Sequence, residues 1–177
     1  MEKSKGIIIR LTKLTETSMI VHWCTLEHGL IKTVAKGARR TKSPFAGKLD
    51  LFFGAEFDWV RSRKGELHTL REVVVSDFRE NLRKRYVDTL AASYFAELIA
   101  HVVEPDHPVP ELYDLLQRGL GYLGEHGADK RAVIHFEAEM ARLLGVADER
   151  CSAVLALERA FGGMPRGRGA TIEALEL

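Results

Sequence analysis

The chain has 177 residues, of which 46% are hydrophobic and 29% are charged, with a net charge of +1. This composition is typical of globular proteins and excludes wholesale disorder, and the length allows one domain or two small ones. Two cysteines are too few for a disulfide framework or a four-thiolate zinc site. No apolar stretch is long enough for a signal peptide or a membrane span, so we expect a cytoplasmic protein that does not contact membranes.

The first 78 residues alternate between apolar and polar side chains, a pattern that predicts half-buried β-strands. Gly29 lies in a predicted hairpin turn between the second and third strands, and Gly65 ends the turn before the fifth. The predicted strands are residues 6–11, 17–25, 30–36, 49–59 and 66–75. Five short strands in this length indicate a small closed barrel of the oligonucleotide-binding (OB) type.

After residue 78, apolar side chains recur every three or four positions, which predicts helices. Asp77 and Glu80 have the spacing of a capping box, so we expect the first helix to begin there and to end before Pro105. The second helix is expected to begin at Pro110. It contains three glycines, which are expected to weaken it.

Asp129 and Asp148 are the predicted caps of a third and a fourth helix, and the Gly/Arg-rich residues 164–170 are expected to form a mobile tail. The whole pattern predicts an α+β protein. Its OB barrel spans residues 1–78, and a domain of about four helices spans residues 79–177.

The charge also changes sign at residue 78, from +5 in the first part to −4 in the second. Residues 31–48 contain six Lys and Arg and no acidic residue. Such side chains neutralise phosphates, and Gly37 would let the main chain approach them closely. We therefore predict nucleic-acid contacts from a set of eight residues, with an unliganded solvated loop as the alternative: Lys32, Lys36, Arg39, Arg40, Lys42, Ser43, Phe45 and Lys48.

Aromatic side chains are the second requirement for binding single strands in an OB barrel, because bases stack on them. Phe53, Phe57 and Trp59 share one face of the predicted fourth strand, so we expect them in the core. Phe45 lies among the basic residues and Phe52 lies on the polar face. These two rings are the predicted stacking platforms.

No metal site or catalytic site is predicted. His22 and Cys24 would project from one face of a strand near His28, but a fourth ligand is missing, and a buried free cysteine is the expected alternative. The sequence contains no nucleophile beside a base, no paired carboxylates and no phosphate-loop motif. We expect no enzymatic activity, no metal and no cofactor.

Several separated motifs together resemble one family. They are Glu16-Thr17-Ser18, Glu27-His28-Gly29, Ala35-Lys36-Gly37-Ala38-Arg39-Arg40 with Lys42-Ser43, Gly47-Lys48-Leu49, Leu67 with Thr69-Leu70, Tyr94-Phe95-Ala96-Glu97-Leu98, Phe136-Glu137 and Leu143-Leu144-Gly145. In order and spacing they resemble the bacterial RecO family of recombination mediators and DNA repair proteins, over about residues 5–163.

This resemblance implies an OB barrel and a helical domain without a catalytic centre, in a nucleoid-associated protein. It implies binding of single- and double-stranded DNA, annealing of complementary strands, and loading of the recombinase RecA together with RecR and the single-stranded DNA-binding protein. The motif positions assign DNA contacts to Lys36, Arg39, Arg40 and Lys42.

The chain departs from the family pattern at two places. Cys151 stands where a four-cysteine zinc element begins, but Val154 replaces the second cysteine and the later pair is absent, as is a further helical stretch. His135 replaces an arginine that helps to hold the acidic tail of the single-stranded DNA-binding protein. We therefore expect no zinc and an altered docking site.

A site for that acidic tail is nevertheless expected in the helical domain. An apolar pocket beside Phe136, with Arg118, Arg131 or Arg142 at its rim, would suit a short acidic peptide with an apolar end. Solvated arginines without a ligand are the alternative.

The sequence thus predicts a non-enzymatic DNA-binding recombination mediator. Two other functions remain open. The protein could be an interaction adaptor of the repair machinery with little DNA binding of its own, or an OB protein that binds RNA, because a basic loop on a barrel does not distinguish the two sugars.

Overall fold

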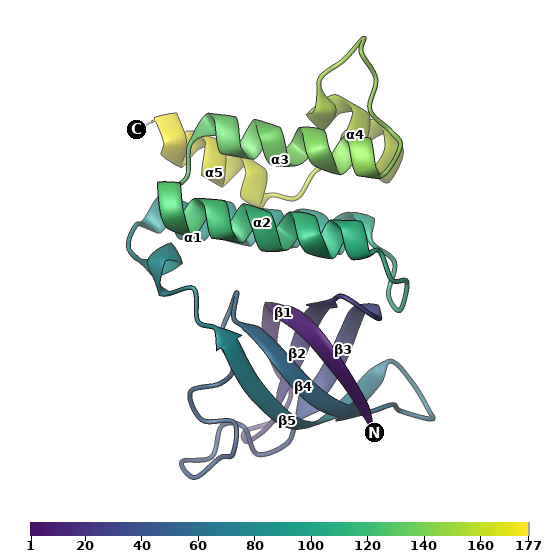
Figure 1. The fold of residues 1–177 in the computed structure, drawn as a ribbon, viewed down its shortest axis with the longest axis vertical. Helices are drawn as coiled ribbons and strands as arrows, with labels where there is room; N and C mark the ends of the chain where they lie inside the picture. The colour runs from purple at the N-terminus through teal and green to yellow at the C-terminus, as the bar shows by residue number, and fades with distance from the viewer. Residues whose placement is uncertain (177) are drawn as a thin grey trace. The chain divides into compact units, whose positions relative to one another are not determined.

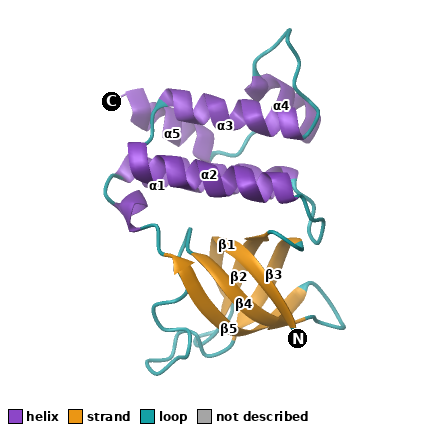
Figure 2. Cartoon of the chain, in the orientation of Figure 1, coloured by secondary structure: helices purple, strands orange, loops and turns teal. Residues whose placement is uncertain are grey.

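The structure is a computed structural model that describes residues 1–176 (Figure 1). The chain divides into two compact units, one formed by residues 1–78 with 103–110 and the other by residues 79–102 with those from 111 onward. Figure 2 shows that the strands belong to the first unit and the helices to the second. The predicted class, an OB-like barrel followed by helices, is confirmed. No helix in the described chain is long and apolar enough to cross a membrane.

The first unit is a closed barrel with the strand order β1-β2-β3-β5-β4. Its strands are β1 (Glu2–Lys13), β2 (Met19–Thr25), β3 (Gly29–Ala35), β4 (Gly54–Val60) and β5 (Leu67–Asp77). The β3–β5 pair is parallel and the other four pairs are antiparallel. Since β1 pairs with both β2 and β4, the sheet has no free edge.

The barrel interior is aromatic, and the N–H groups of both buried tryptophans have hydrogen-bond partners. Trp23 stacks on Phe57 with ring centroids 3.9 Å apart. The Trp23 indole N–H donates to the Thr33 hydroxyl at 2.9 Å, and the Trp59 N–H donates to the Ser4 hydroxyl at the same distance. These bonds allow both tryptophans to be buried without an unpaired donor. The predicted core positions Phe53, Phe57 and Trp59 are indeed buried.

The fourth strand is shorter than predicted. β4 begins at Gly54, and residues 49–53 form a turn in which Phe52 has a φ of 70°. The Phe52 amide donates to the carbonyl of Ile8 at 2.8 Å, and the Ile8 amide donates to Phe53 at 3.0 Å. Positive φ is incompatible with a regular strand, so the apolar alternation before Gly54 arises from a turn that packs on the barrel.

The second unit contains the helices. They are the 3₁₀ helix η1 (Glu80–Arg83) and the α-helices α1 (Tyr86–Val102), α2 (Pro110–His126), α3 (Lys130–Leu143), α4 (Ala153–Phe161) and α5 (Gly167–Glu176). Asp129 caps α3 as predicted, since its carboxylate accepts from the Ala132 amide at 2.7 Å. The glycines of α2 do not interrupt that helix.

Two predicted helix starts are wrong. The capping box at Asp77 does not form, because Arg79 has a φ of 45° and precedes η1, so that α1 begins only at Tyr86. Asp148 does not cap α4. Its carboxylate accepts from the Arg150 amide within a turn, and Ser152 is the cap.

The predicted mobile tail is also wrong, because residues 167–176 form α5. Arg168 lies 2.6 Å from the Glu137 carboxylate, which is buried and also accepts the Tyr94 hydroxyl at 2.6 Å. The Gly167 amide donates to Glu97 at 3.2 Å. A buried carboxylate needs partners, and the tail supplies an arginine for it.

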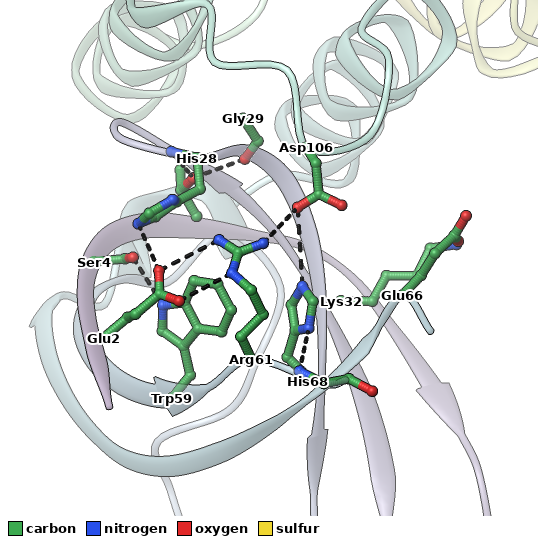
Figure 3. A network of polar contacts seen from close by, with 12 residues as sticks. Glu2, Ser4, His28, Gly29, Lys32, Trp59, Arg61, Glu66, His68 and Asp106 are labelled. Carbon is green, nitrogen blue, oxygen red and sulfur yellow. Dashed lines mark hydrogen bonds and ion pairs between the residues drawn. The ribbon is translucent and has the colours of Figure 1, made fainter. Parts of the chain in front are cut away.

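The α1–α2 connector (residues 103–110) belongs to the barrel unit, although the sequence suggested a loop of the helical domain. The Asp106 amide donates to the carbonyl of Leu30 at 3.0 Å. Figure 3 shows the Arg61 guanidinium between the carboxylates of Asp106, at 3.7 Å, and Glu2, at 3.0 Å. Arg61 also lies over the Trp59 ring, 5.0 Å from its centroid. This network attaches the connector to one end of the barrel.

Gly29 is required where the connector meets the β2–β3 turn. It has a φ of +69°, and a Cβ there would collide with the main chain of His107. His68, buried at 3% exposure, accepts the Ser62 amide at its Nδ1 and has its Nε2 3.9 Å from Asp106. Burial lowers the pKa of His68.

Candidate nucleic-acid interface

The basic loop (residues 36–48) leaves the end of β3 and folds into successive turns. Gly37 and Gly47 both adopt positive φ, at 70° and 71°. The Arg39 amide donates to the carbonyl of Thr17 at 3.0 Å, and the Gly37 amide lies 3.4 Å from the Ser18 hydroxyl. The main chain of the loop is therefore bonded to the β1–β2 turn, which gives its cations a defined position.

Phe45 anchors the same loop from within. The ring is only 6% exposed and belongs to the barrel core, and Phe52 is 2% exposed. The prediction that these two rings stack on bases is therefore wrong. Phe45 fails as a platform because its ring packs into the barrel core, where burial is more favourable than exposure. The Phe45 amide donates to the Ser43 hydroxyl oxygen at 3.1 Å, so Ser43 also shapes the loop.

The cations of the basic loop have no acidic partners. Four of them are exposed and Lys48 is half-buried. None forms an ion pair within residues 1–176. They are Lys36, Arg39, Arg40, Lys42 and Lys48. Several other barrel cations do have partners, which are Lys3–Asp58, Lys5–Glu56, Lys13–Glu16, Lys32–Glu66 and Arg61–Glu2. The loop thus presents positive charge that the protein does not neutralise.

Lys32 is not part of the loop. It lies on the outer face of β3, 3.5 Å from Glu66 and opposite His22 of β2. His22 in turn lies opposite Arg10 of β1. Burial lowers the pKa of His22, and the charges of Arg10 and Lys32 lower it further. Sequence inspection missed this arrangement because strand register cannot be obtained from one sequence.

A second candidate site lies within the helical unit. The aromatic groove has a volume of about 390 Å³ and is lined by Phe95, Leu115, Arg118, Gly119, Tyr122, Asp129, Arg131, Ala132, His135 and Phe136. Its floor is the stacked pair of Phe95 and Phe136, whose centroids are 3.8 Å apart. A Cβ at Gly119 would lie 3.0 Å from the Phe136 ring, so the glycine leaves space that a side chain would fill.

Three of the four predicted partner residues line this groove, namely Arg118, Arg131 and His135. Arg142 does not line it and instead pairs with Glu139 at 2.8 Å, so its assignment to the rim is wrong. Arg118 pairs with Asp114 at 2.8 Å on the preceding turn. Arg131 is exposed and has no ion pair with any described residue, so it is available to an acidic ligand.

The two cysteines belong to different units of the chain. Cys24 is buried in the barrel unit, where burial raises the pKa of its thiol to about 12, and Cys151 is half-buried in the helical unit. Such a thiol does not supply the thiolate that binds a metal. Within residues 1–176, no three His, Cys, Asp or Glu side chains are grouped so that they could hold a metal ion.

Comparison with known proteins agrees with the division of the chain. Residues 1–79 match the family model described as Recombination protein O N terminal, and residues 83–151 match Recombination protein O C terminal. A DNA repair protein RecO from Rhodopirellula baltica is 34% identical over 152 residues, which are 83% of this chain and 55% of the relative.

Similar proteins from other bacteria bear the same name. A DNA repair protein RecO of Listeria monocytogenes is 35% identical over 147 residues, which are 82% of this chain and 56% of the relative. A DNA repair protein RecO of Syntrophotalea carbinolica is 31% identical over 145 residues, which are 81% of this chain and 56% of the relative. The chain spans about half the length of the curated relatives that it matches. With both domain models matched in order along most of its length, the chain belongs to the Recombination protein O family.

Proposed function

We propose that this protein is a non-enzymatic recombination mediator in DNA repair that binds single- and double-stranded DNA through the basic loop. The observation that supports this function is the set of five loop cations without a carboxylate partner, held on a main chain that is bonded to the barrel. The names of the relatives, DNA repair protein RecO, agree with it.

The loop is suited to phosphates more than to bases. Its cations can neutralise backbone charge and release counterions, whereas its one aromatic ring, Phe45, is buried. Interactions of this kind do not depend on sequence, and both single and double strands offer them. We therefore expect binding that is strongly salt-dependent and weakly sequence-dependent.

The test is DNA binding by the full chain across a salt series, with single- and double-stranded oligonucleotides. The variant Lys36→Ala/Arg39→Ala/Arg40→Ala should flatten the slope of log K against log salt by about 0.7 to 0.9 for each phosphate that is no longer neutralised. A matched control, Lys3→Ala/Lys5→Ala/Lys13→Ala, removes the same charge from cations that already have partners. Equal affinity of the loop variant and the wild type would contradict the proposal.

A competition experiment with RNA, under the same conditions, distinguishes DNA binding from RNA binding. A DNA mediator should lose little bound DNA to an equal concentration of RNA of the same sequence. Preferential displacement by RNA would favour the RNA-binding function instead, since 2′-hydroxyl contacts distinguish the two.

The second part of the proposal concerns the aromatic groove. We assign it to the acidic, apolar-ended tail of the single-stranded DNA-binding protein, because Arg131 at its edge has no ion pair with any described residue and Phe95 and Phe136 form an apolar floor. His135 and Arg118 also line the groove. The groove thus combines an apolar surface with cations, as such a peptide requires.

A peptide titration tests this assignment. Arg131→Glu should weaken binding of the tail peptide to the full chain, because it places a carboxylate beside an acidic ligand. Arg142→Glu, outside the groove, serves as the control and should bind like the wild type. Equal weakening by both variants would indicate general electrostatics and contradict the assignment. Cooperation with RecR in loading RecA belongs to the same proposal, and a loading assay with and without RecR tests it.

A further inference from the structure

The strand register aligns three side chains across the barrel. Arg10 of β1 lies directly opposite His22 of β2, and His22 lies directly opposite Lys32 of β3. Residues that face each other on neighbouring strands project from the same side of a sheet, with Cβ atoms about 5 Å apart. Arg10, His22 and Lys32 therefore form a cross-strand row.

The cross-strand row lies on the outer face of the barrel. Along β2, the residues on either side of His22, Val21 and Trp23, are fully buried in the core, and Ile31 and Thr33 are buried beside Lys32. Side chains alternate between the two faces of a strand, so the row faces outward. Arg10 is exposed, and His22 and Lys32 are half-buried.

A β-bulge gives Arg10 its place in the row. Ile8 pairs with Trp23 and Arg10 pairs with the adjacent His22, so the register shifts by one residue at Ile9. With regular pairing, Ile9 would face His22. Bulges of this kind redirect a side chain, and here the redirected side chain is a cation.

The charges around the row are almost entirely positive. The groups that face His22 are Arg10 and Thr12 from β1 and Lys32 from β3, and the Thr12 hydroxyl lies 3.2 Å from its Nε2. Arg10 has no ion pair among the described residues. Lys32 has one at 3.5 Å, with Glu66, whose side chain is 69% exposed. Exposed pairs of this type are weak and can exchange for another anion.

Fold stability does not account for this arrangement. Arg10 and Lys32 flank His22 from the two neighbouring strands, where their like charges repel each other and disfavour the charged form of the ring, and a bulge disrupts the ladder. A ligand whose negative charges are spaced like these two cations would offset their repulsion, because each cation would then be attracted to a negative group of the ligand. The row has the chemistry of a phosphate site.

We propose that Arg10, His22 and Lys32 bind phosphodiester groups of the DNA strand, so that the binding surface extends from the basic loop across the outer face of β1, β2 and β3. This inference rests on the proposed function. Lys32 and Lys36 are four residues apart, which is about 13 Å along an extended chain. That span is within the site of roughly 4 to 16 nucleotides that one OB barrel occupies.

His22 makes this part of the surface proton-dependent. Its pKa is lowered in the free protein by burial and by the two flanking cations, so near neutral pH the ring is mainly neutral. A phosphate beside the ring favours the imidazolium, so DNA binding is coupled to uptake of a proton. The affinity for DNA therefore rises as the pH falls from 8 towards 5.5.

The experiment measures the affinity of the full chain for an oligothymidylate by fluorescence anisotropy at constant salt between pH 8 and 5.5. We expect the wild type to gain about three- to tenfold in affinity over this range, which corresponds to coupling of about 0.7 to 1.4 kcal/mol. His22→Gln should remove most of the gain and keep a hydrogen-bonding side chain. His28→Gln, at a half-buried barrel histidine outside the row, is the matched control and should retain the gain.

Charge removal gives a second, independent measurement. Arg10→Ala/Lys32→Ala should reduce the salt slope by about 0.7 to 0.9 for each cation that binds a phosphate, and Arg10→Lys with Lys32 unchanged should keep the slope of the wild type. Lys3→Ala/Lys5→Ala removes two cations elsewhere on the barrel and should leave the slope near that of the wild type.

The outcomes separate this inference from the proposed function. If the wild type binds no DNA, the proposed function fails. If the wild type binds, the basic-loop variant binds weakly, and the row variants match the wild type in slope and pH profile, only the cross-strand row is overturned. Circular dichroism melting curves show that each variant is folded, and since all three side chains are on the surface, we expect little change.

Discussion

The cations of the basic loop have no acidic partners among residues 1–176, whereas several arginines of the helical unit are paired with carboxylates. Arg85 donates to Asp88 at 2.6 Å, and Arg168 pairs with the buried Glu137. Each of these arginines has a carboxylate within its own unit. The same side-chain chemistry therefore stabilises buried carboxylates of the helical unit and remains available to a ligand in the basic loop.

This difference shows why net charge alone is a poor guide to function. The +5 of residues 1–78 and the −4 of the remainder favour the barrel as the DNA-binding unit, but only the pairing pattern shows which barrel cations remain available. Removing a group from a buried pair should lower stability, and removing an exposed, unpaired loop cation should weaken binding. Four sets of variants compare buried groups with the exposed cations of the basic loop through the free energy of unfolding.

The largest effect is expected at Phe45, the buried anchor of the basic loop. Phe45→Ala should lower the free energy of unfolding by about 3 to 4 kcal/mol, because it leaves a cavity in the barrel core. Urea denaturation followed by tryptophan fluorescence measures this change. Arg40→Ala in the same loop is the control, and a decrease below about 1 kcal/mol in Phe45→Ala would show that the ring is not an anchor.

Glu137 should give the next largest effect. Glu137→Gln leaves Arg168 without its carboxylate and weakens the bond from Tyr94, so we expect a decrease of about 2 to 4 kcal/mol in the same measurement. Glu139→Gln removes a carboxylate from a more exposed pair and should cost less than about 1 kcal/mol. Similar decreases in both variants would contradict the special role of the buried carboxylate.

Asp88 makes stability depend on pH. The hydrogen bonds from Arg85 hold the pKa of this carboxylate below its usual value. Its stabilisation is complete above the pKa of the unfolded state, about 3.9, and is lost as the pH falls through the lower pKa of the folded state. Denaturation from pH 6 to 2 should show a steeper acid destabilisation in the wild type than in Asp88→Asn, which starts about 1 to 2 kcal/mol lower. Parallel curves would contradict this account.

The smallest effect should come from the basic loop itself. Lys36→Ala, Arg39→Ala and Arg40→Ala should each change the free energy of unfolding by less than about 0.5 kcal/mol, since these side chains are exposed and unpaired. Urea denaturation of each variant measures this change. A decrease above about 1 kcal/mol would mean that these cations have structural contacts.

Much of the architecture could be predicted from the sequence, because alternation and helical periodicity record which face of each element is buried. The five strands, the change to helices after residue 78 and the cap at Asp129 all follow from local patterns. The basic loop could also be predicted, because a run of Lys and Arg without acidic neighbours can be recognised within a short stretch of sequence. The structure places that loop at the end of β3, where the pattern predicted it.

Several of the errors share one physical cause, which is contact between residues far apart in sequence. Phe45 was expected to stack on bases, but the loop folds over the core, and the tail was expected to be mobile, but Arg168 binds Glu137, 31 positions earlier. The row of Arg10, His22 and Lys32 depends on a bulge at Ile9. None of these contacts leaves a local signature, so no pattern within a short window could have revealed them.

The α1–α2 connector also has a consequence for synthesis on the ribosome. Asp106 contributes to the barrel unit, yet it is translated only after the whole of α1. Domains usually fold in order as the chain emerges, but here the final contacts at the Gly29 turn must wait until about 110 residues have left the exit tunnel. Nascent chains of which only residues 1–78 to 1–103 have left the exit tunnel should therefore hold a barrel whose connector face is still uncovered and accessible to protease. Longer nascent chains should protect it.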